Sequence, residues 1–199
     1  PDNIRAFEEN GAEIRYFSPL QDAGLPDDLD AVYLPGGYPE EHAKQLAANS
    51  PMKTSLKDFA GAGGTVYGEC GGLMYLGTAL TDRDGHSHSM TGIIPIKTRC
   101  LTKFKRLGYT EVNMQSNTLW GPAGTTLRGH EFHYSEIISD ELDARNWKRG
   151  YNVAMRRDAD KHTEGYTKGN ILGSYIHLHW AANPTAVKHF ITRCCKRTE

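Results

Sequence analysis

The segment of this sequence best suited to covalent chemistry surrounds a single cysteine. Cys70 lies between the β-branched and aromatic run Thr65–Tyr67 and the apolar run Leu73–Leu76, with Gly68 two residues before it and Gly71–Gly72 directly after it. The first run predicts a buried strand, and the second predicts the start of a helix. A sharp turn from strand to helix needs small neighbours and exposes the residue at its apex. The pattern therefore predicts a nucleophile elbow in which Cys replaces the usual Ser.

The predicted helix would assist a cysteine nucleophile. A helix N-terminus favours an anion, so Cys70 is expected to hold its thiolate more readily than a free cysteine does. The amide N–H of Gly71 would point to the place where an oxyanion forms. A tight Gly-rich turn around a buried, inert cysteine has the same local pattern, so the elbow alone does not separate the two interpretations.

A cysteine nucleophile needs a base, which is usually a histidine. Of the nine histidines, His177 follows the apolar stretch Asn170–Ile176, so it is expected at the carboxyl edge of a sheet, where catalytic groups gather. A hydrogen-bonded core histidine remains an alternative for His177, and His179 is the rival base. The H-x-H pairs at 177/179 and 86/88 have no nearby carboxylate cluster and make a poor zinc signature, so no metal site is expected.

A second glycine turn is expected to complete the site. Pro35, Gly36 and Gly37 follow the compact apolar run Ala31–Leu34, which predicts a strand. Glycines at the end of a strand let backbone N–H groups approach a ligand closely. If this turn lies beside the elbow, it offers a second oxyanion donor to partner the N–H of Gly71. An ordinary strand-to-helix turn is the alternative.

The elements that would hold these residues change in kind along the chain. The first 80 residues alternate helices and strands, which predicts a parallel sheet between helices. From residue 91 onward the sequence predicts short strands joined by turns, which indicates an antiparallel or mixed half. The expected helices are 3–10, which Asp2 would cap and Gly11 would end, 40–49, 50–60 and one beginning after 183–184. The expected strands are 13–17, 31–34, 65–67, 92–97, 108–114, 126–132, 134–138, 152–156 and 170–176, with a loop or hairpin at 158–169.

Composition limits the class of protein. The chain has 199 residues, 38% hydrophobic and 24% charged, with a formal net charge of −1, which fits one domain of ordinary globular composition. The charge balance gives no reason to expect a nucleic-acid partner. The four cysteines have no framework spacing, so a cytoplasmic protein is expected. We find no apolar run long enough to span a membrane.

Four segments in combination resemble a known family. They are L-P-G-G-Y-P-E (34–40), G-E-C-G-G-L-M-Y-L (68–76), G-H-E-F-H-Y-S (129–135) and S-Y-I-H-L-H (174–179). They look like the glutamine amidotransferase domain of cobyrinic acid a,c-diamide synthases, within the class I (triad-type) amidotransferase superfamily. The resemblance covers essentially the whole chain. It implies a single α/β domain, three-layered and flavodoxin-like, with a mixed sheet between helices on both faces.

The resemblance also implies roles for the candidate residues. Cys70 would attack L-glutamine, His177 would raise the nucleophilicity of Cys70, and Gly36, Gly37 and Gly71 would frame the oxyanion hole. Most class I members have a Glu two residues after the histidine, but His179 occupies that position here, so we expect a Cys–His dyad. Hydrolysis through a cysteine thioester would supply ammonia for amidation of the a and c carboxylates of cobyrinate in cobalamin biosynthesis.

Further parts of such an enzyme are expected outside this chain. The resemblance implies an N-terminal synthetase domain that binds ATP, Mg²⁺ and cobyrinate. No G-x-x-x-x-G-K-[ST] pattern occurs in these 199 residues, so no cofactor is expected in this chain. Domains of this family begin with a strand before the first helix, whereas this chain starts at the helix. We therefore expect a domain truncated at its N-terminus, with Tyr16 and Tyr33 more exposed than core residues.

Other functions fit the same residues. A stand-alone cysteine hydrolase or peptidase would use the same elbow, and the same amidotransferase could serve another tetrapyrrole, such as hydrogenobyrinate or Ni-sirohydrochlorin. A non-catalytic interaction module is a third possibility, which an intact Cys70 and His177 argue against. Glu131 and His133 have no derivable role in glutamine attack. They are expected either to help form the face that meets the synthetase domain or to be exposed polar groups on a strand.

Overall fold

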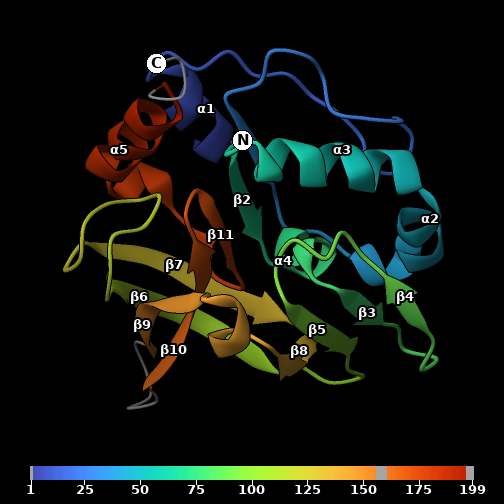
Figure 1. The fold of residues 1–199 in the computed structure, drawn as a ribbon. Coiled ribbons are helices and arrows are strands. Elements are labelled where there is room, and N and C mark those ends of the chain that lie inside the picture. The colour runs from blue at the N-terminus through green and yellow to red at the C-terminus, as the bar shows by residue number, and fades with distance from the viewer. Residues whose placement is uncertain (1, 156–160, 196–199) are drawn as a thin grey trace.

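The computed structural model describes residues 2–155 and 161–195, which fold around two sheets (Figure 1). The larger sheet has the strand order β1-β2-β11-β10-β9-β6-β7-β12, and the smaller has the order β4-β3-β5-β8. The larger sheet consists of β1 (Ala31–Leu34), β2 (Thr65–Glu69), β6 (Arg106–Met114), β7 (Thr126–His133), β9 (Lys148–Met155), β10 (Lys161–Lys168), β11 (Ile171–Ser174) and β12 (His177–Leu178). The smaller consists of β3 (Ala79–Thr81), β4 (Ser87–Ser89), β5 (Ile96–Cys100) and β8 (Ser135–Asp140).

Helices cover the parallel part of the larger sheet on two sides. Figure 1 shows α1 next to α5 on one side of β2, with α3 on the other side. The helices are α1 (Asp2–Glu8), α2 (Ala43–Ala48), α3 (Ser50–Gly61), α4 (Gly71–Leu76) and α5 (Pro184–Cys195), with short 3-10 turns η1 (Pro39–His42), η2 (Asp143–Arg145) and η3 (Trp180–Ala182).

The predicted change from parallel to antiparallel pairing is confirmed. The strands β1, β2 and β11 pair in parallel, and the remaining pairs of the larger sheet are antiparallel. All residues of β2 are buried, as expected for a central strand with helices on both faces. Val66 packs into the core under α3 and α4, while Tyr67 packs into the core under α1 and α5. Alternate residues of one strand therefore serve two cores, which is the three-layer arrangement.

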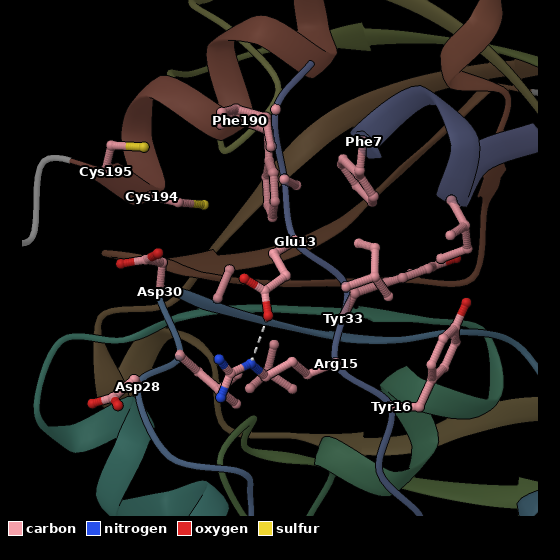
Figure 2. Close-up of a pocket in the computed structure, with 18 of the residues that line it drawn as sticks. Phe7, Glu13, Arg15, Tyr16, Asp28, Asp30, Tyr33, Phe190, Cys194 and Cys195 are labelled. Carbon is pink, nitrogen blue, oxygen red and sulfur yellow. Dashed lines mark hydrogen bonds and ion pairs between the residues drawn. The ribbon is translucent and has the colours of Figure 1, made fainter. Parts of the chain in front are cut away.

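One predicted strand does not form. Residues 13–17 alternate polar and apolar side chains, but they adopt no regular structure, and β1 is the edge of the larger sheet. A strand requires a neighbour for its backbone N–H and C=O groups, and alternation alone does not supply one. Between this segment and β1 lies a cavity of about 470 Å³, bordered by Phe7 and Phe190 from α1 and α5 (Figure 2). Tyr16 is 79% exposed and Tyr33 is partly exposed, so both are more exposed than core residues, as predicted.

Smaller differences concern the ends of elements. The strand predicted at 92–97 is displaced to β5, and the segment predicted as a loop or hairpin contributes β10, which pairs with β9 and β11. The strand predicted over residues 170–176 ends at Ser174, and His177 belongs to the separate strand β12. Asp2, which the sequence predicts as the N-cap, is the first residue of α1. The end of the strand predicted at 152–156 and the start of the predicted loop lie outside the described residues. Among the described residues, no helix is long and apolar enough to cross a membrane.

Candidate active site

Cys70 occupies the predicted junction of strand and helix. It directly follows β2 and caps α4 with φ 50° and ψ −102°, a conformation that non-glycine residues rarely adopt. Its backbone is held on both sides, because its N–H donates to Ser174 O at 2.7 Å and its C=O accepts from Met74 N at 3.1 Å. A strained backbone at the apex of a tight turn is a feature of functional sites.

The sulfur of Cys70 lies between two strands from distant parts of the chain. Its Sγ is 3.8 Å from Phe132 O on β7, and the side chain of Cys70 is nearly buried. His177 contributes its ring from β12. Burial opposes charging of this ring, but hydrogen bonds to Cys70 and Glu69 and the charges of both groups raise the pKa of His177 to about 10. The site therefore holds the proton on His177 across the neutral range.

Glu69 is a third group beside the predicted pair of Cys70 and His177, because its carboxylate contacts the ring of His177. The Oε1 atom of Glu69 lies 3.2 Å from Nδ1 of His177, and Oε2 accepts the N–H of Leu178 at 3.2 Å. The hydroxyls of Tyr33 and Tyr67 each donate to this carboxylate at 3.1 Å. An ionised carboxylate only accepts hydrogen bonds, so Nδ1 of His177 carries a proton toward Glu69 and leaves Nε2 for the cysteine.

The sequence analysis did not single out Glu69, because the family resemblance places the carboxylate two residues after the histidine. The expected position of the carboxylate, two residues beyond His177, holds His179, whose side chain is exposed and whose residue precedes η3. The carboxylate that contacts His177 comes instead from Glu69, the residue before Cys70. A signal was available, because a single Glu at the end of a buried strand must find donors for its charge.

The glycine turn lies against the elbow, as expected. A Cβ atom at Gly36 would overlap the ring of His177, and a Cβ at Gly71 would lie 2.7 Å from Gly37 O. The first amides of a helix have no acceptor within that helix, which leaves the N–H of Gly71 for a ligand. The three glycines therefore border the space beside Cys70 and His177. Their part in an oxyanion hole stays a prediction.

His130 is a further residue of the site that sequence reasoning did not single out. It is the Cα partner of His177 across β7 and β12, and the two rings stack 4.8 Å apart with an interplanar angle of 11°. Partial burial and the charge of His177 lower the pKa of His130. A neutral imidazole thus covers one face of the charged ring.

The expectation for Glu131 and His133 is wrong in its placement. Both are buried, with 2% and 6% of their surfaces exposed, so they do not form a docking face. Oε1 of Glu131 lies 3.5 Å from Nε2 of His133 and 3.6 Å from Nε2 of His162. Burial would raise the pKa of Glu131, but the two histidines outweigh it and lower this pKa to about 2. The pair belongs to an internal polar cluster on the face of β7 opposite His130.

Potential metal ligands gather elsewhere. In the part of the chain that the structure describes, Asp82, Asp84 and His86 place one donor atom each within 4.8 Å of one another on a largely exposed turn. The predicted H-x-H pairs do not combine, because His88 bonds Asp82 at 2.7 Å whereas His177 faces Cys70 and Glu69. An acidic turn of this kind is common on protein surfaces and is separate from Cys70.

The sequence matches one family model over most of its length, at residues 2–185: the CobB/CobQ-like glutamine amidotransferase domain. The cobyrinate a,c-diamide synthase of Syntrophotalea carbinolica is 48% identical over 98% of this chain and 42% of that protein. The cobyrinate a,c-diamide synthase of Salmonella typhimurium is 40% identical over 96% of this chain and 41% of that protein. The chain thus spans about two fifths of the length of these curated relatives.

Solved structures agree on the fold. A structure described as a glutamine amidotransferase superposes with a TM-score of 0.69 at 15% identity, covering 98% of this chain and 93% of that chain. The glutaminase domain of a Trypanosoma brucei protein with bound acivicin superposes with a TM-score of 0.57 at 11% identity, covering 100% of this chain and 88% of that chain. At such identities the likeness establishes the fold alone, which is the predicted α/β fold of class I glutamine amidotransferases.

Proposed function

We propose, from the premise that this chain belongs to the CobB/CobQ-like glutamine amidotransferase domain family, that it releases ammonia from glutamine for the a,c-diamidation of cobyrinate. The relatives that match nearly all of this chain carry the name cobyrinate a,c-diamide synthase. This chain corresponds to less than half of each, so the whole reaction requires residues beyond those printed here.

The geometry supports a two-step hydrolysis. The Cys70 thiolate attacks the side-chain amide carbon of glutamine, and the amides of Gly37 and Gly71 stabilise the resulting oxyanion. His177 donates its proton to the departing nitrogen, so that ammonia leaves and a glutamyl thioester remains. His177 then accepts a proton from water, which attacks the thioester, releases glutamate and regenerates the thiolate. Glu69 keeps the imidazole in the orientation and tautomer that both steps need.

The observation that carries this proposal is the contact of His177 with both Cys70 and Glu69 beneath a strained elbow. The glutamine analogue diazo-oxo-norleucine should therefore alkylate Cys70 and spare Cys100, Cys194 and Cys195. Mass spectrometry of the labelled peptides gives the answer, and the C70S variant is the control. Even labelling of all four cysteines would contradict a specific nucleophile at Cys70.

A partner domain would dock on the exposed face beside the site. Leu107 and Tyr109 on β6 pair with Phe132 and His130 on β7, so they share the face that carries His177. Leu107 is 62% exposed and Tyr109 74% exposed, and nearby Phe104 is 48% exposed. Adjacent exposed apolar side chains are typical of an interaction surface. We assign this surface to the synthetase domain. That domain would bind ATP, Mg²⁺ and cobyrinate, because the 199 residues of this chain contain no G-x-x-x-x-G-K-[ST] phosphate-binding pattern.

The names of the relatives favour an amidotransferase over a stand-alone cysteine hydrolase, and they favour cobyrinate as its tetrapyrrole. The decisive assay measures ammonia release and amide formation by the complete protein, with and without ATP, on cobyrinate and on hydrogenobyrinate. We expect glutaminase activity in each case and ATP-dependent amidation of cobyrinate. Amidation of hydrogenobyrinate alone would identify hydrogenobyrinate, and not cobyrinate, as the substrate. Peptide hydrolysis without glutaminase activity would support the stand-alone hydrolase.

A further inference from the structure

The chain changes sheet partners just before it supplies His177. Strand β11 pairs in parallel with β2, whereas β12 pairs antiparallel with β7. Between them, Tyr175 and Ile176 belong to no strand, and both are buried. This short turn carries the chain from β11, which pairs with the strand before Cys70, to β12, which supplies His177. Without a ladder, its backbone N–H groups need other acceptors.

The carboxyl group of Glu164 supplies these acceptors. The ladder between β10 and β11 ends at the pair Tyr166 and Gly173. Beyond that point, Oε1 of Glu164 accepts the backbone N–H of Tyr175 at 2.7 Å, and Oε2 accepts the hydroxyl of Ser174 at 2.5 Å. The same hydroxyl oxygen accepts the N–H of Ile176 at 3.0 Å. Glu164 thus bonds Ser174 and Tyr175 directly, and it reaches Ile176 through the hydroxyl of Ser174.

The turn is joined to both catalytic groups. Ser174 O accepts the backbone N–H of Cys70 at 2.7 Å, so Ser174 connects Glu164 to the strained elbow. Three residues after Ser174, the ring of His177 meets the same cysteine. A displacement of Ser174 would therefore move the nucleophile and its proton donor relative to each other.

We propose that Glu164 is a positioning residue for the glutaminase reaction, acting through the 174–176 turn to set the separation of Cys70 and His177. The inference rests on the proposed function of this site and adds a residue that does not touch substrate. The carboxyl group is buried, with 4% of Glu164 exposed, and within residues 2–155 and 161–195 no Lys or Arg bonds to it.

The surroundings of Glu164 disfavour the charged form of its carboxyl group. Burial raises its pKa to about 7, the bonds from Ser174 and Tyr175 lower it, and the nearby charge of Glu131 raises it. The buried hydroxyl of Tyr151 lies in the same layer, opposite Glu164 across β9 and β10. A buried carboxyl group without a cationic partner is unfavourable unless its hydrogen bonds are needed.

The test compares E164A and E164Q with T167V in the complete protein. Thr167 bonds Ile171 O in the same hairpin but does not reach the turn, so T167V controls for loss of hairpin stability. The readouts are kcat and KM for glutamine hydrolysis and the rate of Cys70 alkylation by iodoacetamide as a function of pH. Alkylation does not require glutamine, so it reports on the turn even if the protein does not hydrolyse glutamine.

We expect E164A to lower kcat about 10²-fold, the usual cost of misplacing a catalytic group by an ångström. KM should change less than kcat, and the pH profile of Cys70 alkylation should shift. The E164Q variant keeps an acceptor for Tyr175 and a polar partner for Ser174, so it should recover much of kcat. If E164A, E164Q and T167V all lose thermal stability while kcat and the alkylation profile stay unchanged, Glu164 is only structural and the inference fails. Absence of glutaminase activity in the unmodified protein, with a shifted alkylation profile in E164A, would overturn the proposed function and leave the positioning role intact.

Discussion

At the scale of single residues, Glu69 orients the ring of His177 and raises its pKa. Its carboxylate accepts bonds from His177, Leu178, Tyr33 and Tyr67, and its charge helps to raise the pKa of His177. The E69Q variant keeps the shape but removes the charge and offers donors where only acceptors fit. We expect kcat for glutamine to fall about 10²–10⁴-fold.

The pKa of His177 should fall in E69Q, and NMR titration of its ring would measure the change. The variant E41Q, which removes an exposed carboxylate, is the matched control and should leave both kcat and this pKa unchanged. An E69Q variant with unaltered kcat would show that His177 needs no carboxylate partner.

Also at the residue scale, Glu164 makes stability depend on pH. Its pKa in the folded protein is raised to about 7, mainly by burial, from an ordinary value of 4.5. Between these values the folded state holds a proton that the unfolded state releases. Its contribution is therefore fully present below pH 4.5 and is lost as pH rises through 7. Measured by urea unfolding, the stability of the wild type relative to E164Q should fall by about 3 kcal/mol across this window. A difference that is constant with pH would contradict the assignment.

At the scale of elements, the site depends on how closely α4 packs against β1. A Cβ atom at Gly72, in the first turn of α4, would overlap the carbonyl of Leu34 at the end of β1. Backbone atoms cannot rotate away as a side chain can, so G72A should push α4 outward. We expect a loss of about 1–3 kcal/mol in unfolding free energy, with slower alkylation of Cys70.

The matched control for G72A is G61A, at the end of α3, where a Cβ would meet no atom within 4 Å. It should be neutral or slightly stabilising, because Ala restricts the unfolded chain. Equal alkylation rates of Cys70 in G72A and G61A would show that the elbow tolerates movement of α4.

At the scale of the whole molecule, the cavity lies where β1 forms the edge of the larger sheet. One edge of β1 pairs with β2, while the other faces the cavity that residues 13–17 border (Figure 2). A form of the protein with one more strand beside β1 would pair with this edge and bury Ile14, which is partly exposed. We expect such an N-terminally extended form to have a higher melting temperature, by about 2–4 °C for each kcal/mol gained.

Calorimetry of the two forms measures this effect, and an extension of the same length with proline in its centre is the control. Proline cannot donate to a ladder, so the control should melt with the shorter chain. If the two extended forms melt together, the added segment forms no strand beside β1.

The sequence by itself determined the local features of this protein. The glycines around Cys70, the glycine turn after Leu34 and the change from alternating helices to successive strands could be predicted, because they depend on residues a few positions apart. The choice of His177 over His179 came from a family resemblance, and the structure places the ring of His177 against Cys70.

Tertiary structure decided which distant side chains meet. Glu69 bonds a histidine 108 residues away, and His130 stacks on that histidine because of the register between β7 and β12. A shift of one residue in that register would turn His130 to the other face, and no local pattern specifies it. For the same reason, the alternation at residues 13–17 predicts a strand that does not form, since pairing requires a neighbouring strand as well as a suitable sequence.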